Sequence, residues 1–281
     1  MDWNWFFSAM AQSTAAIVGL FAAFIITKII NNQTEFARKK DQISELCNEA
    51  LRYIESADNR YFNWYNERRM ATGLNHVREM IIKDTDQLTA EEYYSEIYFP
   101  IYEKKDEVLK QIQSVKDDFP ALHEGAWTSI DLGVELTNKL VKEEDDINRL
   151  ITEINHHIRR INSTLLSIKG NPESSGLIAI SIGSVILLFF SGVIYPLSFL
   201  PLKADAEITL SFTAFWDILL STKGIMLLIV SIIFSGITTV FLKINSTLTY
   251  DETDIENLRL YSNISSYSDF FKIMEENAKQ D

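Results

Sequence analysis

Two adjacent histidines, His156 and His157, are the residues in this sequence best suited to bind a metal. Glu153 precedes His156 by three positions, and di-iron carboxylate bundles present Glu-x-x-His pairs of this kind from a helix face. Such a site needs a second pair and further glutamates, but neither His76 nor His123 has an acidic residue three positions before it. We therefore expect both histidines to lie on a solvated helix face, with no metal bound.

The sequence contains no recognisable set of catalytic residues. The sequence contains no HExxH, P-loop, GxSxG or dinucleotide-binding pattern. Cys47, the only cysteine, lies in an apolar helical pattern, where a cysteine is more typical of a core than of a nucleophile. We expect a protein that is not an enzyme, with no catalytic residue and no cofactor.

Small and polar residues recur inside three apolar runs of the chain. Residues three or four positions apart share a helix face, and small residues there allow close helix packing, with hydroxyls and amides bonding across helices. A stripe of this kind can instead line a water-filled path, where hydroxyls replace part of an ion's hydration shell. Both roles, helix packing and pore lining, are open for Ser8, Gln12, Ala16, Gly19, Ala23, Thr27, Ser181, Ser184, Ser191, Ser231, Ser235 and Thr238.

The three apolar runs, at 5–30, 176–194 and 224–242, are long enough to cross a membrane as helices, which takes roughly 20 residues. A signal peptide would begin with basic residues, and residues 1–5 contain none, so we predict a true first span. No span contains Asp, Glu or His, so a proton relay would need a carboxylate from a partner subunit. The scarcity of Gly and Pro favours an all-α membrane protein.

Basic residues flank the spans mostly on one side, since the 195–223 loop has only Lys203 and Lys223 and residues 1–5 have none. Lys28, Arg38, Lys39 and Lys40 follow the first span, Arg159, Arg160 and Lys169 precede the second, and Lys243 follows the third. By the positive-inside rule, the N-terminus is outside and the tail is cytosolic, in a bacterial inner membrane. The net charge of −13 argues against nucleic acid as a partner.

This topology divides the chain into six parts. We predict an outside N-terminus with the first transmembrane helix at 1–31, a long helical, coiled-coil-like cytosolic stalk at 32–172 with a distal cap at 73–127, a second transmembrane helix at 173–197, a short outer loop at 198–222, a third transmembrane helix at 223–244, and an acidic cytosolic tail at 245–281.

The stalk carries two apolar seams with the alternating 4-3 spacing of coiled coils. One seam leaves the membrane after the first span and the other returns before the second, which predicts an antiparallel pair; packing of each seam on another subunit is the alternative. The outgoing helix has no Gly or Pro from 20 to 72, and 31–32 is its expected weak point. The seam residues are Ile43, Cys47, Ala50, Ile54, Ala57, Tyr61 and Trp64, then Ile147, Ile151, Ile154, Ile158, Ile161, Leu165 and Ile168.

The distal cap and the tail add shorter helices. Thr89 and Glu92 form a candidate capping box, and the aromatic residues at 93–102 are expected to make a small core at the tip, with a docking surface for a cytosolic partner as the alternative. We expect two short tail helices packed on the stalk base, the last one capped by Ser268.

The segment IVGLFAAFI at 17–25 resembles the sequence of the last span in the TolQ/ExbB family of energy-transducing inner-membrane channels. The topology is similar as well: an outside N-terminus, a span, a large helical cytosolic segment, and two spans joined by a short outer loop. The layout also resembles membrane effectors of bacterial antiphage systems.

These patterns predict an oligomeric inner-membrane protein that forms or gates an ion-conducting pore under the control of its cytosolic helical domain. Its expected partners are membrane lipid and further copies of itself. The alternatives are a non-conducting scaffold or receptor that docks a cytosolic partner through the stalk tip, and a stator-like subunit of an ion-driven complex.

Overall fold

The computed structural model describes residues 3–83, 88–118, 133–171, 173–174, 176–200 and 212–280, and every regular element in these ranges is a helix. Three of the described helices are long and apolar enough to cross a membrane, as expected for a multi-pass membrane protein. The helices are α1 (Trp3–Asp58), α2 (Phe62–Lys83), α3 (Ala90–Glu96), α4 (Lys105–Asp117), α6 (Gly133–Ile168), α7 (Gly176–Phe189), η1 (Phe190–Ile194), α8 (Tyr195–Phe199), α9 (Phe212–Leu219), α10 (Thr222–Ser246), α11 (Glu252–Leu260), η2 (Ile264–Ser266) and α12 (Asp269–Asn277).

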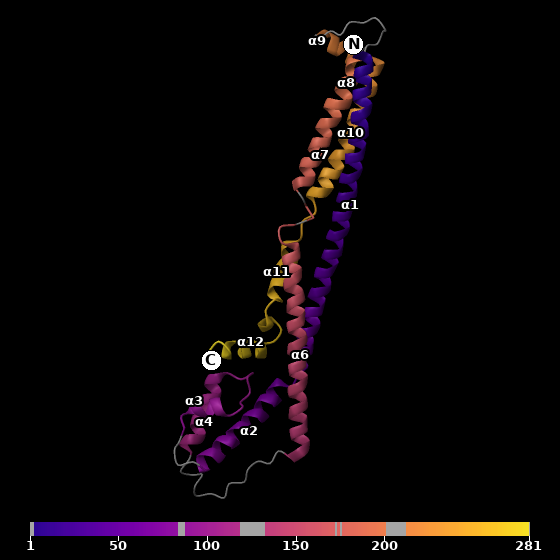
Figure 1. Cartoon of the computed structure of the whole chain (residues 1–281). Coiled ribbons are helices and arrows are strands. Elements are labelled where there is room, and N and C mark those ends of the chain that lie inside the picture. The colour runs from indigo at the N-terminus through magenta and orange to yellow at the C-terminus, as the bar shows by residue number, and fades with distance from the viewer. Residues whose placement is uncertain are drawn as a thin grey trace. The chain divides into compact units, whose positions relative to one another are not determined.

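The chain folds into two units, and Figure 1 shows the course of the helices in each. The first unit comprises Met1–Asp41 and Ser167–Asp251, and it holds the three candidate spans. The second unit comprises Gln42–Leu166 and Glu252–Asp281. The chain therefore passes between the units three times, at 41–42, 166–167 and 251–252.

α1 is one unbroken helix, as the absence of Gly and Pro predicted. The expected weak point is not a break, because Asn32 is buried and its side chain donates a hydrogen bond. One helical face is buried or partly buried along the whole length, at spacings of three and four residues. This packing face consists of Ala11, Thr14, Val18, Ala22, Ile25, Ile29, Asn32, Phe36, Lys39, Ile43, Leu46, Ala50, Tyr53 and Ala57.

In the second unit, α1 and α6 run antiparallel within the same chain. Gln42 bonds Thr164 at 3.0 Å, Glu49 contacts His157 at 3.1 Å, and Arg60 pairs with Asp146 at 3.1 Å. The buried residues of α6 keep the alternating spacing, but every second position lies one residue earlier than predicted, so Ile151, Ile158 and Leu165 are only half-buried. The buried set is Ile147, Leu150, Ile154, His157, Ile161, Thr164 and Ile168.

The outgoing seam ends earlier than predicted. α1 stops at Asp58, and Tyr61 is 70% exposed, so Tyr61 is not a seam residue. The Tyr61 backbone N–H donates to a Glu143 carboxylate oxygen at 3.0 Å. A carboxylate at this position stabilises the start of α2, because the N-terminal end of a helix carries a partial positive charge. The acidic residues of α6 therefore favour an elbow between α1 and α2.

The α2–α4 tip has its own core. Tyr93 and Phe99 are buried there with Val108 and Ile112, and the Phe99 ring lies where a Cβ on Gly73 would come within 2.6 Å of it. The predicted capping box is confirmed, because Thr89 and Glu92 exchange hydrogen bonds between side chain and backbone at the start of α3. The predicted aromatic core is present, with Tyr98 left 52% exposed.

The last helix of the tail does not pack on the stalk base as expected. Ser268 caps α12 as predicted, but α12 lies in the elbow, where Phe270 stacks on Phe62 with ring centroids 4.6 Å apart. Phe271 is fully buried in the same cluster. Aromatic contacts hold α12 in the elbow, because Phe270 stacks on Phe62 and Phe271 meets Tyr102 edge to face.

The candidate spans pack through α1. Val18 lies among Val185, Phe189 and Val193 of the second span, and Phe234 of α10 stacks on Phe189 at 4.0 Å between centroids. The second span contains a π-helical turn, η1, which brings Gly192 against Thr14 of α1. At the start of α10, Lys223 donates to the backbone carbonyls of Ser198 and Leu200.

We expect Gly192→Ala to weaken the packing of the spans. An added Cβ would lie 2.8 Å from Thr14 Oγ1 and 2.9 Å from Thr14 Cβ, so rotation of the threonine side chain does not relieve the clash. Overpacking of this kind costs about 1–3 kcal/mol. The measurement is thermal unfolding of the purified protein in detergent.

The matched control is Gly183→Ala, on the same span with open space around it. That variant should melt at or above the wild-type temperature, since alanine is the better helix former. Equal melting of the two variants would contradict the close contact at Gly192.

Candidate functional site: a buried polar clamp

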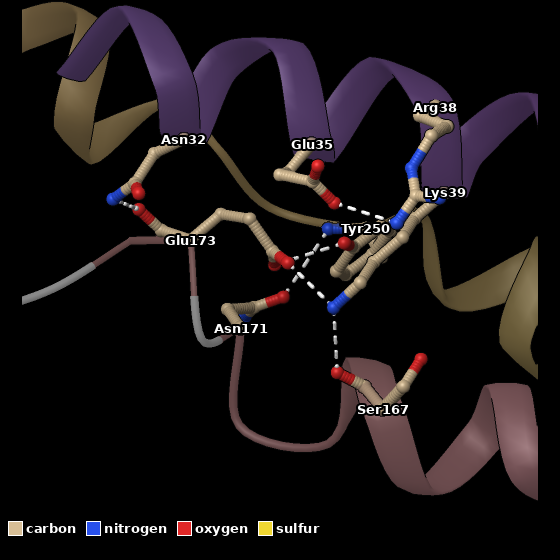
Figure 2. A network of polar contacts seen from close by, with 8 residues as sticks. All are labelled: Asn32, Glu35, Arg38, Lys39, Ser167, Asn171, Glu173 and Tyr250. Carbon is tan, nitrogen blue, oxygen red and sulfur yellow. Dashed lines mark hydrogen bonds and ion pairs between the residues drawn. The ribbon is translucent and has the colours of Figure 1, made fainter. Parts of the chain in front are cut away.

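Glu173, in the short link between α6 and α7, is a buried carboxylate with 5% of its surface exposed. One carboxylate oxygen accepts from Lys39 Nζ of α1 at 2.6 Å. The other accepts from the Tyr250 hydroxyl at 2.9 Å. Figure 2 shows the lysine and the tyrosine approaching Glu173 from different segments of the chain.

Further bonds surround this carboxylate. Lys39 also donates to the Ser167 carbonyl at 2.9 Å, and the Asn32 side chain donates to the Glu173 carbonyl at 2.9 Å. The Tyr250 backbone N–H donates to the Asn171 side-chain oxygen at 3.4 Å. We call this network the clamp; its residues are Asn32, Lys39, Ser167, Asn171, Glu173 and Tyr250.

The turn after α6 positions Asn171 and Glu173. α6 ends at Ile168, where Gly170 and Asn171 had predicted a helix stop. These two residues have φ angles of +78° and +48°. Glycine adopts this left-handed region without strain and asparagine tolerates it better than most residues. Two such residues in succession end the helix and turn the chain back towards α1. Pro172, the third residue of the predicted stop, lies outside the described residues.

Electrostatics keep the clamp in one protonation state. Burial disfavours the charged form of Glu173, but the hydrogen bonds from Lys39 and Tyr250 outweigh it and hold the pKa of the carboxyl below its usual 4.5. Burial, then the neighbouring Glu173 carboxylate, raises the pKa of the Tyr250 hydroxyl. At neutral pH the tyrosine is therefore a neutral donor to an ionised glutamate. The ring centroids of Tyr250 and Phe36 are 4.8 Å apart.

The clamp includes residues next to every point where the chain leaves the first unit. Lys39 lies two residues before the first passage, Ser167 begins the return, and Tyr250 precedes the last passage by one residue. The neighbouring Glu35–Arg38 pair, also drawn in Figure 2, is exposed at both side chains. Exposed pairs contribute little to stability, so of the two ion pairs the buried one at Glu173 is expected to contribute more.

The predicted stripe of the first span lies beside the packing face of α1. Gln12, Ala16, Gly19, Ala23 and Thr27 are exposed and Ser8 is half-buried. The stripe is offset from the packing face by one residue, roughly 100° around the helix. Within this chain, the second and third spans therefore pack on α1 through other residues. The Gln12 side-chain amide has no hydrogen-bond partner among the described residues.

Six hydroxyls of the predicted set bond inside their own helices. Ser181, Ser184 and Ser191 are exposed, while Ser231, Ser235 and Thr238 are half-buried. The hydroxyls that donate to the carbonyl four residues earlier are those of Thr27, Ser181, Ser184, Ser191, Ser231 and Thr238. These hydroxyls place no demand on a neighbouring helix.

His157 forms a second buried polar site, in the second unit, although both histidines were expected on a solvated face. His156 is exposed as expected, but only 1% of His157 is exposed. Its Nδ1 lies 3.1 Å from a Glu49 oxygen that also accepts from Arg160 at 2.7 Å. Burial lowers the pKa of the imidazole below 6.5, although the Glu49 carboxylate opposes the shift.

Comparisons with protein-family models, with curated proteins and with solved structures found no match to this chain. The resemblance to the TolQ/ExbB family therefore stays a prediction from the residues at 17–25, which lie within α1, and from the predicted topology.

We expect Glu173→Gln to destabilise the first unit. The substitution removes the charge that Lys39 faces and leaves a largely buried ammonium without its counter-ion, which costs about 3 kcal/mol. The measurement is denaturant-induced unfolding in detergent. Glu35→Gln is the matched control, on the exposed pair with Arg38, and should change stability by less than about 1 kcal/mol. Equal small effects of both variants would show that the clamp contributes little.

Acidification should weaken the second unit through His157. The folded state disfavours the protonated imidazole, so the unfolded chain binds more protons below 6.5 and stability falls as the pH drops through that value. We expect the melting temperature to decrease from about pH 7.5 to about pH 5.5 in the wild type, and to decrease less in His157→Gln. His156→Gln, at the exposed neighbour, should keep the wild-type slope. A slope that is unchanged in His157→Gln would contradict this assignment.

Proposed function

We propose that the protein is an oligomeric integral membrane protein that forms or gates an ion-conducting pore, controlled by its cytosolic helical domain. In this proposal the second unit is cytosolic, the N-terminus is outside, and the membrane is the bacterial inner membrane. The observation that carries the proposal is Gln12, an exposed amide inside the first candidate span that has no hydrogen-bond partner among the residues that the structure describes.

An amide without a hydrogen-bond partner has an unfavourable free energy in lipid. Moving one into hydrocarbon without a hydrogen bond costs about 4 kcal/mol or more. A second copy of the chain, or water in a pore between copies, would remove that cost. Gly19 and Ala23 on the same stripe would let another helix approach closely. Three spans are too few to enclose a wide conduit, so a pore requires several copies.

Control by the helical domain is supported by the continuity of α1 and by the clamp. α1 carries the stripe in its first half and the α6-pairing face in its second half, without a helix break. A shift of α1 would move Lys39 relative to Glu173, a contact on which two further segments depend. A stalk that senses a signal can therefore bias the arrangement of the spans. The same features fit a stator-like subunit, which the resemblance to the TolQ/ExbB family favours.

The second candidate function is a non-conducting scaffold or receptor. Tyr98 and Ile101 remain exposed beside the buried tip core, and together they offer a small apolar surface to a cytosolic partner. This function predicts partner capture by the tip and no ion leak.

The deciding test is conductance of the purified protein in liposomes. The proposal predicts an ion flux that Gln12→Leu changes at least about tenfold, because the change removes the amide that stabilises either the subunit contact or the ion path. Gln33→Leu is the matched control, the same substitution at an exposed position on the same helix beyond the span. Native mass spectrometry should show more than one copy.

Tight liposomes that contain correctly assembled wild-type protein would contradict the pore and favour the scaffold. A flux altered equally by the two leucine variants would contradict the role given to Gln12.

A further inference from the structure

Tail residues 267–271 pack inside the elbow, the bend between α1 and α2. Among its described residues the second unit has two hydrophobic cores, one within the α2–α4 tip and one where the tip meets the α1/α6 pair. The second of these cores includes residues of five segments: Ala57 of α1, Phe62 and Tyr65 of α2, Tyr102 of the α3–α4 loop, Ile147 of α6, and Tyr267 and Phe271 of the tail. The tail therefore fills the joint between the tip and the helix pair.

Asn277, in the last turn of α12, fixes the tail to the loop between α3 and α4. Its side-chain nitrogen donates to the carbonyls of Ile101 at 3.1 Å and Glu103 at 2.8 Å. Its side-chain oxygen accepts from the Lys105 backbone N–H at 3.3 Å, at the start of α4. Asn277 is buried, so one residue of the tail satisfies three backbone groups of the tip.

The tail is suited to detach without unfolding the rest of the unit. α12 and η2 have local bonds of their own beside their contacts with the elbow: Ser268 caps α12, and the Tyr267 hydroxyl donates to the Tyr261 carbonyl at 2.7 Å. The three backbone groups that Asn277 satisfies belong to a surface loop, so water can replace the asparagine when α12 leaves. The tip keeps its own core through Val108 and Ile112 of α4.

We propose that residues 261–280 form a releasable strap that sets the α1–α2 elbow, docked through Phe270, Phe271 and Asn277. One short helix separates the strap from the third candidate span, because α10 ends at Ser246 and α11 spans Glu252–Leu260. The chain thus connects the third span to the elbow by one short helix, and α1 connects the elbow to the first span. Release of the strap frees the tip to swing on the break at 59–61. This inference does not depend on ion conduction.

Hydrogen exchange of the full chain in detergent tests docking. Asn277→Ala should speed exchange of the Lys105 amide and of the α12 amides about tenfold, since the variant removes three hydrogen bonds. Exchange in α7 should not change. Asn257→Ala is the matched control, at an exposed position of α11. Should Asn277→Ala fail to fold, Asn277→Asp keeps the side-chain size and the acceptor for Lys105 and removes the two donations.

Spin labels across the elbow test what the strap controls. Glu55→Cys on α1 and Glu67→Cys on α2 are exposed positions, and Cys47→Ser removes the only native cysteine. The distance distribution between the labels should be narrow in the wild type and in Asn257→Ala, and broadened in Asn277→Ala. Fast exchange of α12 in the wild type would overturn the docked strap. An unchanged label distance despite faster α12 exchange would overturn its control of the elbow.

Discussion

The buried carboxylate of Glu173 is the constraint on which the arrangement of the first unit depends. An ionised group that has lost its water needs a counter-charge and hydrogen-bond donors, or the ionised state costs several kcal/mol. Glu173 obtains both, but from different segments: Lys39 comes from α1 and Tyr250 from the segment after α10. Because each oxygen has its own partner, the carboxylate is satisfied only when α1, the α6–α7 link and the end of the third span are all in place.

The clamp interrupts the mostly apolar packing face of α1 near the boundary of the first unit. The packing face of α1 is apolar along most of the span and again along the α6-pairing half, and Asn32 and Lys39 are its polar members next to the boundary of the first unit. Apolar contacts tolerate small shifts in register, whereas an ion pair with fixed hydrogen bonds tolerates few. A long helix packed only by aliphatic residues would have a poorly determined register. The clamp removes that freedom where the chain passes between the two units.

Local signals in the sequence predicted most of the fold. The spans, the helix stop at Gly170, the capping box at Thr89 and the cap at Ser268 each depend on a few neighbouring residues, and each is present. The returning seam was predicted with the correct period but with every second position displaced, because His157 and Thr164 occupy buried positions that an apolar pattern does not detect. Leu150 and Ile154 are four residues apart, and the next step of three residues in the same alternating spacing leads to His157.

Non-local contacts could not be predicted from the sequence. Glu173 is a single acidic residue between a helix stop and an apolar run, and nothing nearby indicates that a lysine and a tyrosine from distant segments reach it. The position of α12 in the elbow likewise depends on Phe62 and on the backbone of residues 101–105, far from the tail in sequence. The spacing of apolar residues indicates an amphipathic helix but not the surface that this helix covers.

The polar residues of the spans differ in what they require. A serine or threonine that donates to the carbonyl four residues earlier is satisfied within its own helix, so it can face lipid, water or protein at similar cost. Thr27, Ser181, Ser184, Ser191, Ser231 and Thr238 are all satisfied in this way and do not by themselves indicate a pore or a neighbour. A glutamine side chain has two donors and an acceptor, and Gln12 satisfies none of them within the described chain. Of these residues, Gln12 is therefore the one that requires a second copy or water, while Gly19 and Ala23 determine how closely that copy can approach.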